Sequence, residues 1–214
     1  GEIIKGILYE DAIQRGIGKT EIRAIDKNWD DKFSNGLSIE NKWAGNTKES
    51  MQAPDTIDGL KLYSTTRIMF ENKYGAPQSE QPDGEDMMGT YTKCIYPFGY
   101  AIFLDRGNES EPFLVELSTN SSSFAGPRST GIGTRMQDVI DAYRDEGGES
   151  NAKGGRLLYS LTDKNMRRIG MLEKTSDTEY EIGYYCMLEN GQFISLIYHV
   201  TDGLVDRMDW TQYD

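Results

Sequence analysis

The sequence predicts an α+β fold built from two tandem repeats, each a helix followed by an antiparallel meander, with the helices packed on one side of the sheet. Three observations support this: a helical pattern occurs twice, a cysteine-bearing hairpin pattern occurs twice, and a closing strand follows each hairpin. We expect an N-terminal arm or short helix over residues 1–35, a first repeat over 36–118, and a second repeat over 119–214 with an insertion around 148–170.

The two helices are predicted over Thr65–Tyr74, in "STTRIMFENKYGAP", and over Thr134–Asp145, in "GTRMQDVIDAYRDEG". Each begins with a threonine, whose side-chain oxygen is able to accept a hydrogen bond from a backbone N–H of the first turn. In the second helix Gln137 stands at capping-box spacing from this threonine. Gly75 and Gly147 end the helices, because glycine readily adopts the left-handed conformation that often follows a helix.

Strands are predicted after each helix at matching positions. "CIYPFGYAIFL", from Cys94, aligns with "CMLENGQFISL", from Cys186, and "FLVELST" (113–119) aligns with "LVDRMDW" (204–210). The Asn-Gly pair in the second hairpin indicates a two-residue turn, because both residues tolerate positive φ. The spacing between the two copies is larger for the hairpins than for the helices, and this difference implies the insertion.

This arrangement resembles a known family. Two tandem units of a helix and a meander, with the lead-in "GLKLYSTTRIMFENKYGAP", are similar to the β-lactamase inhibitor protein fold. Relatives of that fold include outer-membrane assembly lipoproteins and uncharacterised secreted Gram-positive proteins. The resemblance covers residues 36–214 and implies an exported, often lipid-anchored, binding or assembly module with no catalytic residues to carry over. The second copy departs from the pattern, because Gly147-Gly148 replaces the Gly-x-Pro that ends the first helix.

Composition and charge exclude several classes of function. The 214 residues carry a formal net charge of −12, which would repel nucleic-acid backbones and anionic membrane surfaces. No apolar run approaches the roughly 20 residues that a membrane-spanning helix needs. The chain opens on Gly1 rather than Met, and we expect an extracellular or cell-envelope protein from which a signal peptide or lipid anchor has been removed.

The predicted sheet offers a candidate binding face, because side chains alternate between the two faces along a strand. Two-residue turns at both hairpins would place a mostly aliphatic set under the helices: Ile95, Ile102, Leu104, Met187, Ile194, Leu196, Tyr198 and Val200. The other face would then carry the candidate binding residues, most of them aromatic: Tyr96, Phe103, Tyr180, Tyr184, Phe193 and His199. The alternatives are that these residues pack against the N-terminal arm as ordinary strand residues, or that the two faces are swapped.

No catalytic residue, metal ligand or cofactor is predicted. "GIGKT" (16–20) lacks the first glycine and the preceding strand of a phosphate-binding loop. "DKNWDD" (26–31) begins like a calcium loop but lacks the glycine and the final glutamate of that loop. His199 is the sole histidine, and no Gly-x-Ser-x-Gly segment accompanies it.

The function that we expect is a non-catalytic module that recognises a protein or glycan partner through an exposed sheet face. The alternative is a hydrolase of unfamiliar type that uses carboxylates in a cleft between the repeats, because acidic residues are abundant although no pair stands out.

The two cysteines, Cys94 and Cys186, occupy the same place in both copies. A disulfide needs Cα atoms within roughly 7 Å of each other, whereas equivalent positions in side-by-side repeats are separated by several strands, each ~4.8 Å wide. We therefore expect two free thiols. Only a two-fold arrangement that meets at these strands would permit a disulfide.

Overall fold

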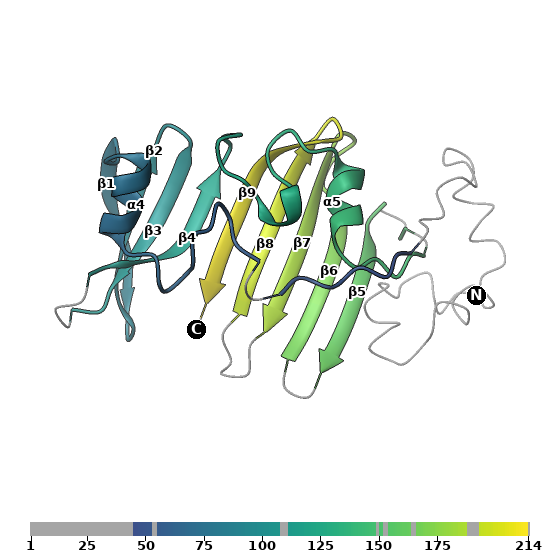
Figure 1. Ribbon diagram of the computed structural model, residues 1–214, viewed down its shortest axis with the longest axis horizontal. Helices are drawn as coiled ribbons and strands as arrows, with labels where there is room; N and C mark the ends of the chain where they lie inside the picture. The colour runs from purple at the N-terminus through teal and green to yellow at the C-terminus, as the bar shows by residue number, and fades with distance from the viewer. Residues whose placement is uncertain are drawn as a thin grey trace.

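The computed structural model describes residues 45–52, 55–107, 111–148, 150–151, 154–163, 166–187 and 193–213 (Figure 1). These residues form two α-helices, one short 3-10 helix and nine strands. In chain order the elements are α4 (Arg67–Tyr74), β1 (Ser79–Asp86), β2 (Gly89–Tyr96), β3 (Gly99–Asp105), β4 (Phe113–Thr119), η2 (Pro127–Ser129), α5 (Met136–Ala142), β5 (Arg156–Asp163), β6 (Met166–Lys174), β7 (Glu179–Met187), β8 (Phe193–Thr201) and β9 (Leu204–Tyr213).

All nine strands belong to one antiparallel sheet with the order β1-β2-β3-β4-β9-β8-β7-β6-β5. Consecutive strands pair within β1–β4 and within β5–β9, so each stretch of chain is a meander. The meanders join where β4 pairs with β9 and Ser118 lies opposite Asp209. Two residues 91 positions apart in the sequence thereby become neighbours in the middle of the sheet.

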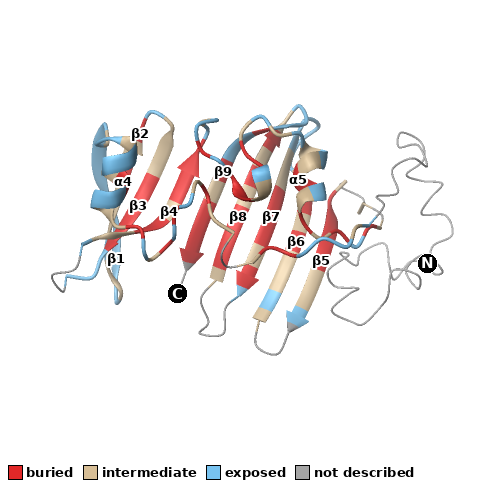
Figure 2. Cartoon of the chain, viewed as in Figure 1, coloured by how far each residue is buried: buried red, intermediate tan, exposed pale blue. Residues whose placement is uncertain are grey.

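Both helices cover the same face of the sheet, and the main hydrophobic core lies beneath them (Figures 1 and 2). Under α4, the ring of Phe70 packs against Tyr96 and Phe103, with centroids 5.4 and 5.5 Å away. Near the end of α5, the ring of Tyr143 packs against that of Tyr184 with centroids 4.1 Å apart. Aromatic side chains therefore join each helix to the strands below it.

Charged groups anchor the segments that run over this core. The Arg128 guanidinium donates to the backbone oxygen of Glu49 at 2.8 Å and to the carboxylate of Asp55 at 2.9 Å. Asp145 and Arg156, whose side chains are only 2% and 1% exposed, form a bidentate ion pair with two hydrogen bonds of 2.6 Å. A buried pair of this geometry is costly to break, because one unpaired charge would remain inside.

Both predicted helices are present, but they differ in how their ends are capped. The side chain of Thr66 caps α4 by accepting from the Met69 N–H at 3.2 Å, and Gly75 ends the helix with φ 86°. The predicted capping box of the second helix is wrong. The N-cap of α5 is Arg135, which makes no side-chain cap bond, and the Thr134 hydroxyl instead accepts an N–H from the preceding loop.

The predicted fold class is wrong. Over the residues that the structure describes, the chain is β-rich, a single nine-stranded sheet with two helices of 8 and 7 residues, and not an α+β fold of two tandem helix-plus-meander repeats. The region around 148–170, predicted as an insertion, supplies β5 and part of β6. The acidic segment 79–86, whose residues are all exposed, becomes β1 by pairing with β2. Both segments form strands because their backbones pair with a neighbouring strand. Such tertiary pairing is poorly predicted by the local sequence pattern.

The predicted assignment of side chains to the two faces is also wrong in part. In the second hairpin Met187 pairs with Phe193, so Tyr184 lies opposite Leu196 and shares its face. The two-residue turn that we predicted would have placed Met187 opposite Ile194. Because side chains alternate along a strand, this one-residue difference moves Tyr184 from the open face to the helix-covered face.

The prediction of two free thiols is confirmed, since Cys94 and Cys186 are both free and buried. Cys94 lies in β2 and Cys186 in β7, and four other strands separate β2 from β7 in the sheet. At ~4.8 Å per strand, the two positions are about 24 Å apart, far beyond the reach of a disulfide.

Other sequence predictions concern the N-terminus and the membrane. The N-terminal arm of residues 1–35, including the segments that were compared with phosphate and calcium loops, lies outside the described residues. None of the helices in the described part of the chain is long and apolar enough to span a membrane.

Candidate functional site

The candidate site lies on the face of the sheet opposite the helices, which we call the open face. The hydrophobic cluster on this face centres on Ile102, Leu104 and Val115 and includes no residue of α4 or α5. The main core, in contrast, includes Phe70 of α4 and Val139 of α5. The described helices therefore cover one face of the sheet only.

A row of interacting polar side chains crosses the open face from β2 to β7, and we call it the polar belt. Its members come from six strands that are neighbours in the sheet. A cation–π contact and a hydrogen bond join Lys93, Tyr100 and Glu116. Hydrogen bonds and ion pairs join Ser118, Asp209, Arg207, His199 and Glu181. The two groups are adjacent, because Tyr100 lies opposite Ser118.

The strand registers bring the belt together. Ser118 of β4 lies opposite Asp209 of β9. Further along β9, Arg207 lies opposite His199 of β8, which in turn lies opposite Glu181 of β7. Directly opposed residues of an antiparallel pair point to the same face. Polar residues at alternating positions of these strands therefore form one row.

Asp209 is at the centre of the belt. Its carboxylate accepts the Ser118 hydroxyl at 2.6 Å and lies 2.6 Å from His199 Nε2. Arg207 Nε lies 3.3 Å from the same carboxylate. Burial alone would raise the pKa of Asp209, but the hydrogen bonds from His199 and Ser118 outweigh it and hold the pKa below its ordinary value. Asp209 is therefore ionised at neutral pH and orients its neighbours.

The imidazole of His199 is fixed between two carboxylates. Only 17% of its side chain is exposed; Nδ1 lies 3.1 Å from Glu181 Oε1 and Nε2 lies 2.6 Å from Asp209 Oδ2. The Ser118 hydroxyl donates to Asp209 rather than to His199. The order serine–aspartate–histidine thus lacks the serine–histidine contact through which a hydrolase triad activates its nucleophile.

Glu116 is the second partly buried carboxylate of the belt. It accepts the Tyr100 hydroxyl at 2.7 Å, and the ammonium of Lys93 lies 3.6 Å from the centre of the Tyr100 ring. Burial raises the pKa of Glu116, the hydrogen bond from Tyr100 opposes this, and the negative charge of Asp209 adds to the increase. The belt therefore contains two carboxylates whose pKa values are displaced in opposite directions.

An aromatic platform lies beside the belt, formed by Tyr185 of β7 and Phe193 of β8. The two rings stack with centroids 5.6 Å apart and planes 20° from parallel. Gly183 makes room for the Tyr185 ring, because a Cβ at this position would come within 2.7 Å of the ring atoms. Ser195 and Thr211 lie opposite each other between the platform and the belt, and both are buried by their larger neighbours.

The structure separates the six binding residues that the sequence predicted. Phe193 and His199 lie on the open face, in the platform and the belt. Tyr180 is half-buried and packs against the main core. The other three are inside that core with at most 3% of their surface exposed: Tyr96, Phe103 and Tyr184. Their predicted exposure is wrong, because α4 and α5 pack on the face that we had assigned to a partner.

Sequence reasoning missed most of the belt, although a signal was present. In "FLVELST" the polar Glu116 and Ser118 alternate with apolar residues, and in "VDRMDW" Arg207 and Asp209 do the same. Such alternation marks the solvated side of an antiparallel strand. No local signal shows that these two segments pair with each other, so the contacts between them could not be predicted from the sequence.

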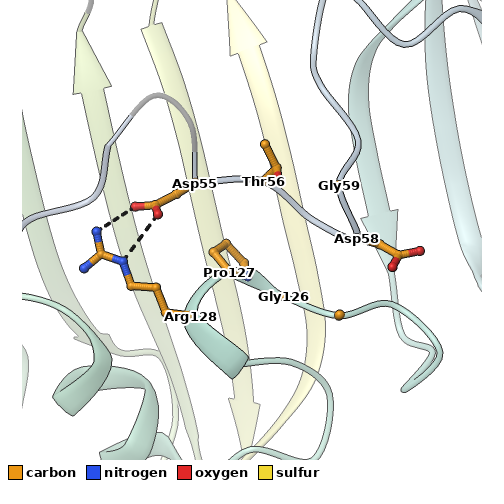
Figure 3. A pocket seen from close by; sticks show the side chains of 8 residues that line it. Asp55, Thr56, Asp58, Gly59, Gly126, Pro127 and Arg128 are labelled. Carbon is orange, nitrogen blue, oxygen red and sulfur yellow. Dashed lines mark hydrogen bonds and ion pairs between the residues drawn. The ribbon is translucent and has the colours of Figure 1, made fainter.

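A second candidate is a pocket of 390 Å³ on the helix-covered face (Figure 3). It is lined by two short segments: Asp55, Thr56, Asp58, Gly59, Ala125, Gly126, Pro127 and Arg128. Its charged groups already have partners, since Arg128 pairs with Asp55 at 2.9 Å and Lys73 pairs with Asp58 at 2.8 Å. These contacts anchor the segments over the core, so a ligand would compete with the fold for them.

No group of three or more His, Cys, Asp or Glu side chains within the described residues could hold a metal ion. A search of protein families, curated proteins and solved structures finds no match to this chain. The resemblance to the β-lactamase inhibitor protein fold therefore stays a prediction, and the function has to be argued from the site itself.

Proposed function

We propose that this chain is a non-catalytic binding module of the cell envelope or the extracellular space, and that it recognises a protein or glycan partner through the open face. The observation that supports this most strongly is the polar belt, a set of eight interacting side chains on the face that no described helix covers. The sequence resemblance supports the location outside the cell.

The side chains of the belt are more buried and more extensively hydrogen-bonded than those of an ordinary solvated surface. Asp209 and His199 are only 23% and 17% exposed, and removing polar groups from water costs free energy that hydrogen bonds only partly return. A network of this kind fixes the directions of its donors and acceptors. Such pre-organisation reduces the entropy that is lost when a partner binds, which favours a recognition role.

One observation favours the alternative function, a hydrolase of unfamiliar type. Glu116 and Asp209 lie on adjacent strands where the two meanders join, and their pKa values are displaced in opposite directions. A pair of this kind suits an acid and a base. Against this role, Ser118 and His199 already engage both oxygens of Asp209, so the carboxylate has little freedom to take part in a reaction.

A co-sedimentation assay with isolated cell-envelope fractions tests the proposed function. Arg207→Glu reverses a charge that is 50% exposed on the open face, and Arg135→Glu reverses one that is 74% exposed at the start of α5. We expect the wild type and Arg135→Glu to sediment with the fraction and Arg207→Glu to stay in solution. Equal binding by Arg207→Glu and the wild type, or no binding by the wild type, would contradict the proposal.

A hydrolysis assay decides the alternative. Wild type and Glu116→Gln are incubated with chromogenic glycosides and esters, and release of the chromophore is followed. The binding proposal predicts no turnover by either protein. Turnover by the wild type that Glu116→Gln abolishes would favour the hydrolase instead.

A further inference from the structure

We propose that the ligand of the open face is a neutral oligosaccharide, which the aromatic platform contacts at one end and the polar belt binds at the other. This inference rests on the proposed function, because it names the chemical class that the same face recognises. Sugar rings present C–H groups on their faces and hydroxyl groups around their edges, so they need a flat aromatic surface next to fixed hydrogen-bonding groups.

The platform supplies the flat surface. The rings of Tyr185 and Phe193 are nearly parallel, 20° apart, and both are half-buried on the open face. Aromatic rings held in this way offer a large apolar contact at little cost in side-chain entropy. Gly183 is part of this arrangement, since any larger residue would push the Tyr185 ring away from the sheet.

The distance from the platform to the belt implies an oligomer. Phe193 and Ile197 are four residues apart on β8, and Ile197 lies opposite Asp209. At ~3.3 Å per residue, about 13 Å separates Phe193 from the centre of the belt, and the Tyr185 ring, which lies over Gly183 opposite Ile197, covers part of this distance. The small side chains of Ser195 and Thr211, which their larger neighbours bury, lie along this path on the two central strands. A single sugar is too short to reach both ends.

The belt supplies the hydrogen-bonding groups. Carboxylates accept hydroxyl protons and guanidinium groups donate to hydroxyl oxygens, and both make stronger hydrogen bonds than neutral groups do. Glu181 is 39% exposed and Arg207 is 50% exposed, so both are accessible to a ligand, while Asp209 and His199 hold them in position from below. The polar groups that would contact the ligand are therefore held in place before it binds.

Charge indicates that the oligosaccharide is neutral. Three of the belt side chains are carboxylates, Glu116, Glu181 and Asp209, against the two cations Lys93 and Arg207. The whole chain carries a formal net charge of −12. Glycans that carry phosphate, sulfate or uronic acid groups would be repelled on approach.

The distribution of exposed apolar residues favours a glycan over a protein. Protein interfaces usually have an apolar centre surrounded by polar groups. The most exposed large apolar side chains in the described residues are Ile68 and Met69 on α4, Met87 and Leu204 at hairpin turns, and Met187 beside the platform. The cluster of Ile102, Leu104 and Val115 also lies on the open face, but these side chains are at most 6% exposed, so the polar belt and not an apolar centre is accessible there.

Isothermal titration calorimetry with defined hexasaccharides tests this inference. The probes are the neutral hexamers of glucose, mannose, xylose and N-acetylglucosamine, with the hexamer of galacturonic acid as an anionic comparison. We expect at least one neutral hexamer to bind the wild type and the anionic hexamer not to bind. Phe193→Leu, which keeps apolar volume but removes the ring, and Asp209→Asn should each weaken binding at least tenfold.

Met69→Ala on α4 is the matched control and should bind like the wild type, and thermal unfolding checks that each variant is folded. If no neutral hexamer binds while the protein still sediments with envelope fractions, the glycan inference is overturned and the proposed function stands. Tighter binding of the anionic hexamer, or neutral binding unchanged in a folded Phe193→Leu variant, would also overturn it.

Discussion

Replacing Tyr184 with alanine should destabilise the protein by about 3–5 kcal/mol, the range for truncation of a buried aromatic residue. Tyr184 is completely buried, and its ring lies 4.1 Å from that of Tyr143 and 6.1 Å from that of Tyr159. Its hydroxyl also donates to the backbone oxygen of Val139 in α5 at 3.3 Å. Alanine would leave a cavity under α5 and remove this link between the sheet and the helix.

Phe193→Ala is the control, because it truncates the next hairpin strand on the opposite face. Phe193 is half-buried and loses mainly its stacking on Tyr185, so we expect a cost of about 1 kcal/mol. The assays are urea unfolding and thermal unfolding, both followed by circular dichroism, with both variants at one pH and salt concentration. For a chain of this size, ~2–4 °C of melting temperature per kcal/mol gives a decrease of about 6–20 °C for Tyr184→Ala.

The contrast between the two variants tests the register of the second hairpin. A one-residue slip in this register would place Tyr184 and Phe193 on the same face, so that both would be inside or both exposed. Similar costs for the two truncations would refute the register, and a cost of several kcal/mol for Phe193→Ala with about 1 kcal/mol or less for Tyr184→Ala would refute the location of the open face.

Three other predictions concern charge and thiols. Asp145→Ala should cost about 3–5 kcal/mol in urea unfolding, because Arg156 keeps a buried charge without its partner; a cost below 1 kcal/mol would show that the pair is solvated. Because burial raises the pKa of Glu116 in the folded state, its contribution to stability is present below pH 4.5 and is lost as pH rises through the folded pKa. Glu116→Gln should therefore be at least as stable as the wild type at pH 7 and no more stable than the wild type at pH 4. A Glu116→Gln variant that is less stable than the wild type at pH 7 would show that the ionised carboxylate is stabilising. Thiol titration under denaturing, non-reducing conditions should find Cys94 and Cys186 both reactive, and a count of zero would indicate a disulfide.

The sequence predicted individual helices and strands better than it predicted which of them lie next to each other. The threonine-rich start and Gly75 were enough to place α4, because a cap and a stop act within a few residues. The second helix is shorter than expected, since Arg135 provides no side-chain cap and the helix ends at Ala142. The Asn-Gly pair indicated a hairpin correctly, but the pairing of Met187 with Phe193 differs by one residue from the register that a two-residue turn at this pair would give.

The candidate site depended on contacts that no local pattern contains. The alternation of Glu116 and Ser118 with apolar residues marks a solvated strand face, yet only the pairing of β4 with β9 brings Ser118 to Asp209. His199 was singled out because it is the sole histidine, and its carboxylate partners became visible only with the register of β7, β8 and β9. Face assignment failed for Tyr184 because a register error of one residue exchanges the faces.

A methionine footprint tests most directly that the open face is the binding face. Met187 on the open face and Met69 on α4 are 44% and 59% exposed, so hydroxyl radicals should oxidise both in the free protein. In the protein bound to an envelope fraction, mass spectrometry should find oxidation of Met187 reduced several-fold and oxidation of Met69 unchanged. Protection of Met69 with Met187 still oxidised at its free rate would contradict the account, because the partner would then lie on the helix-covered face.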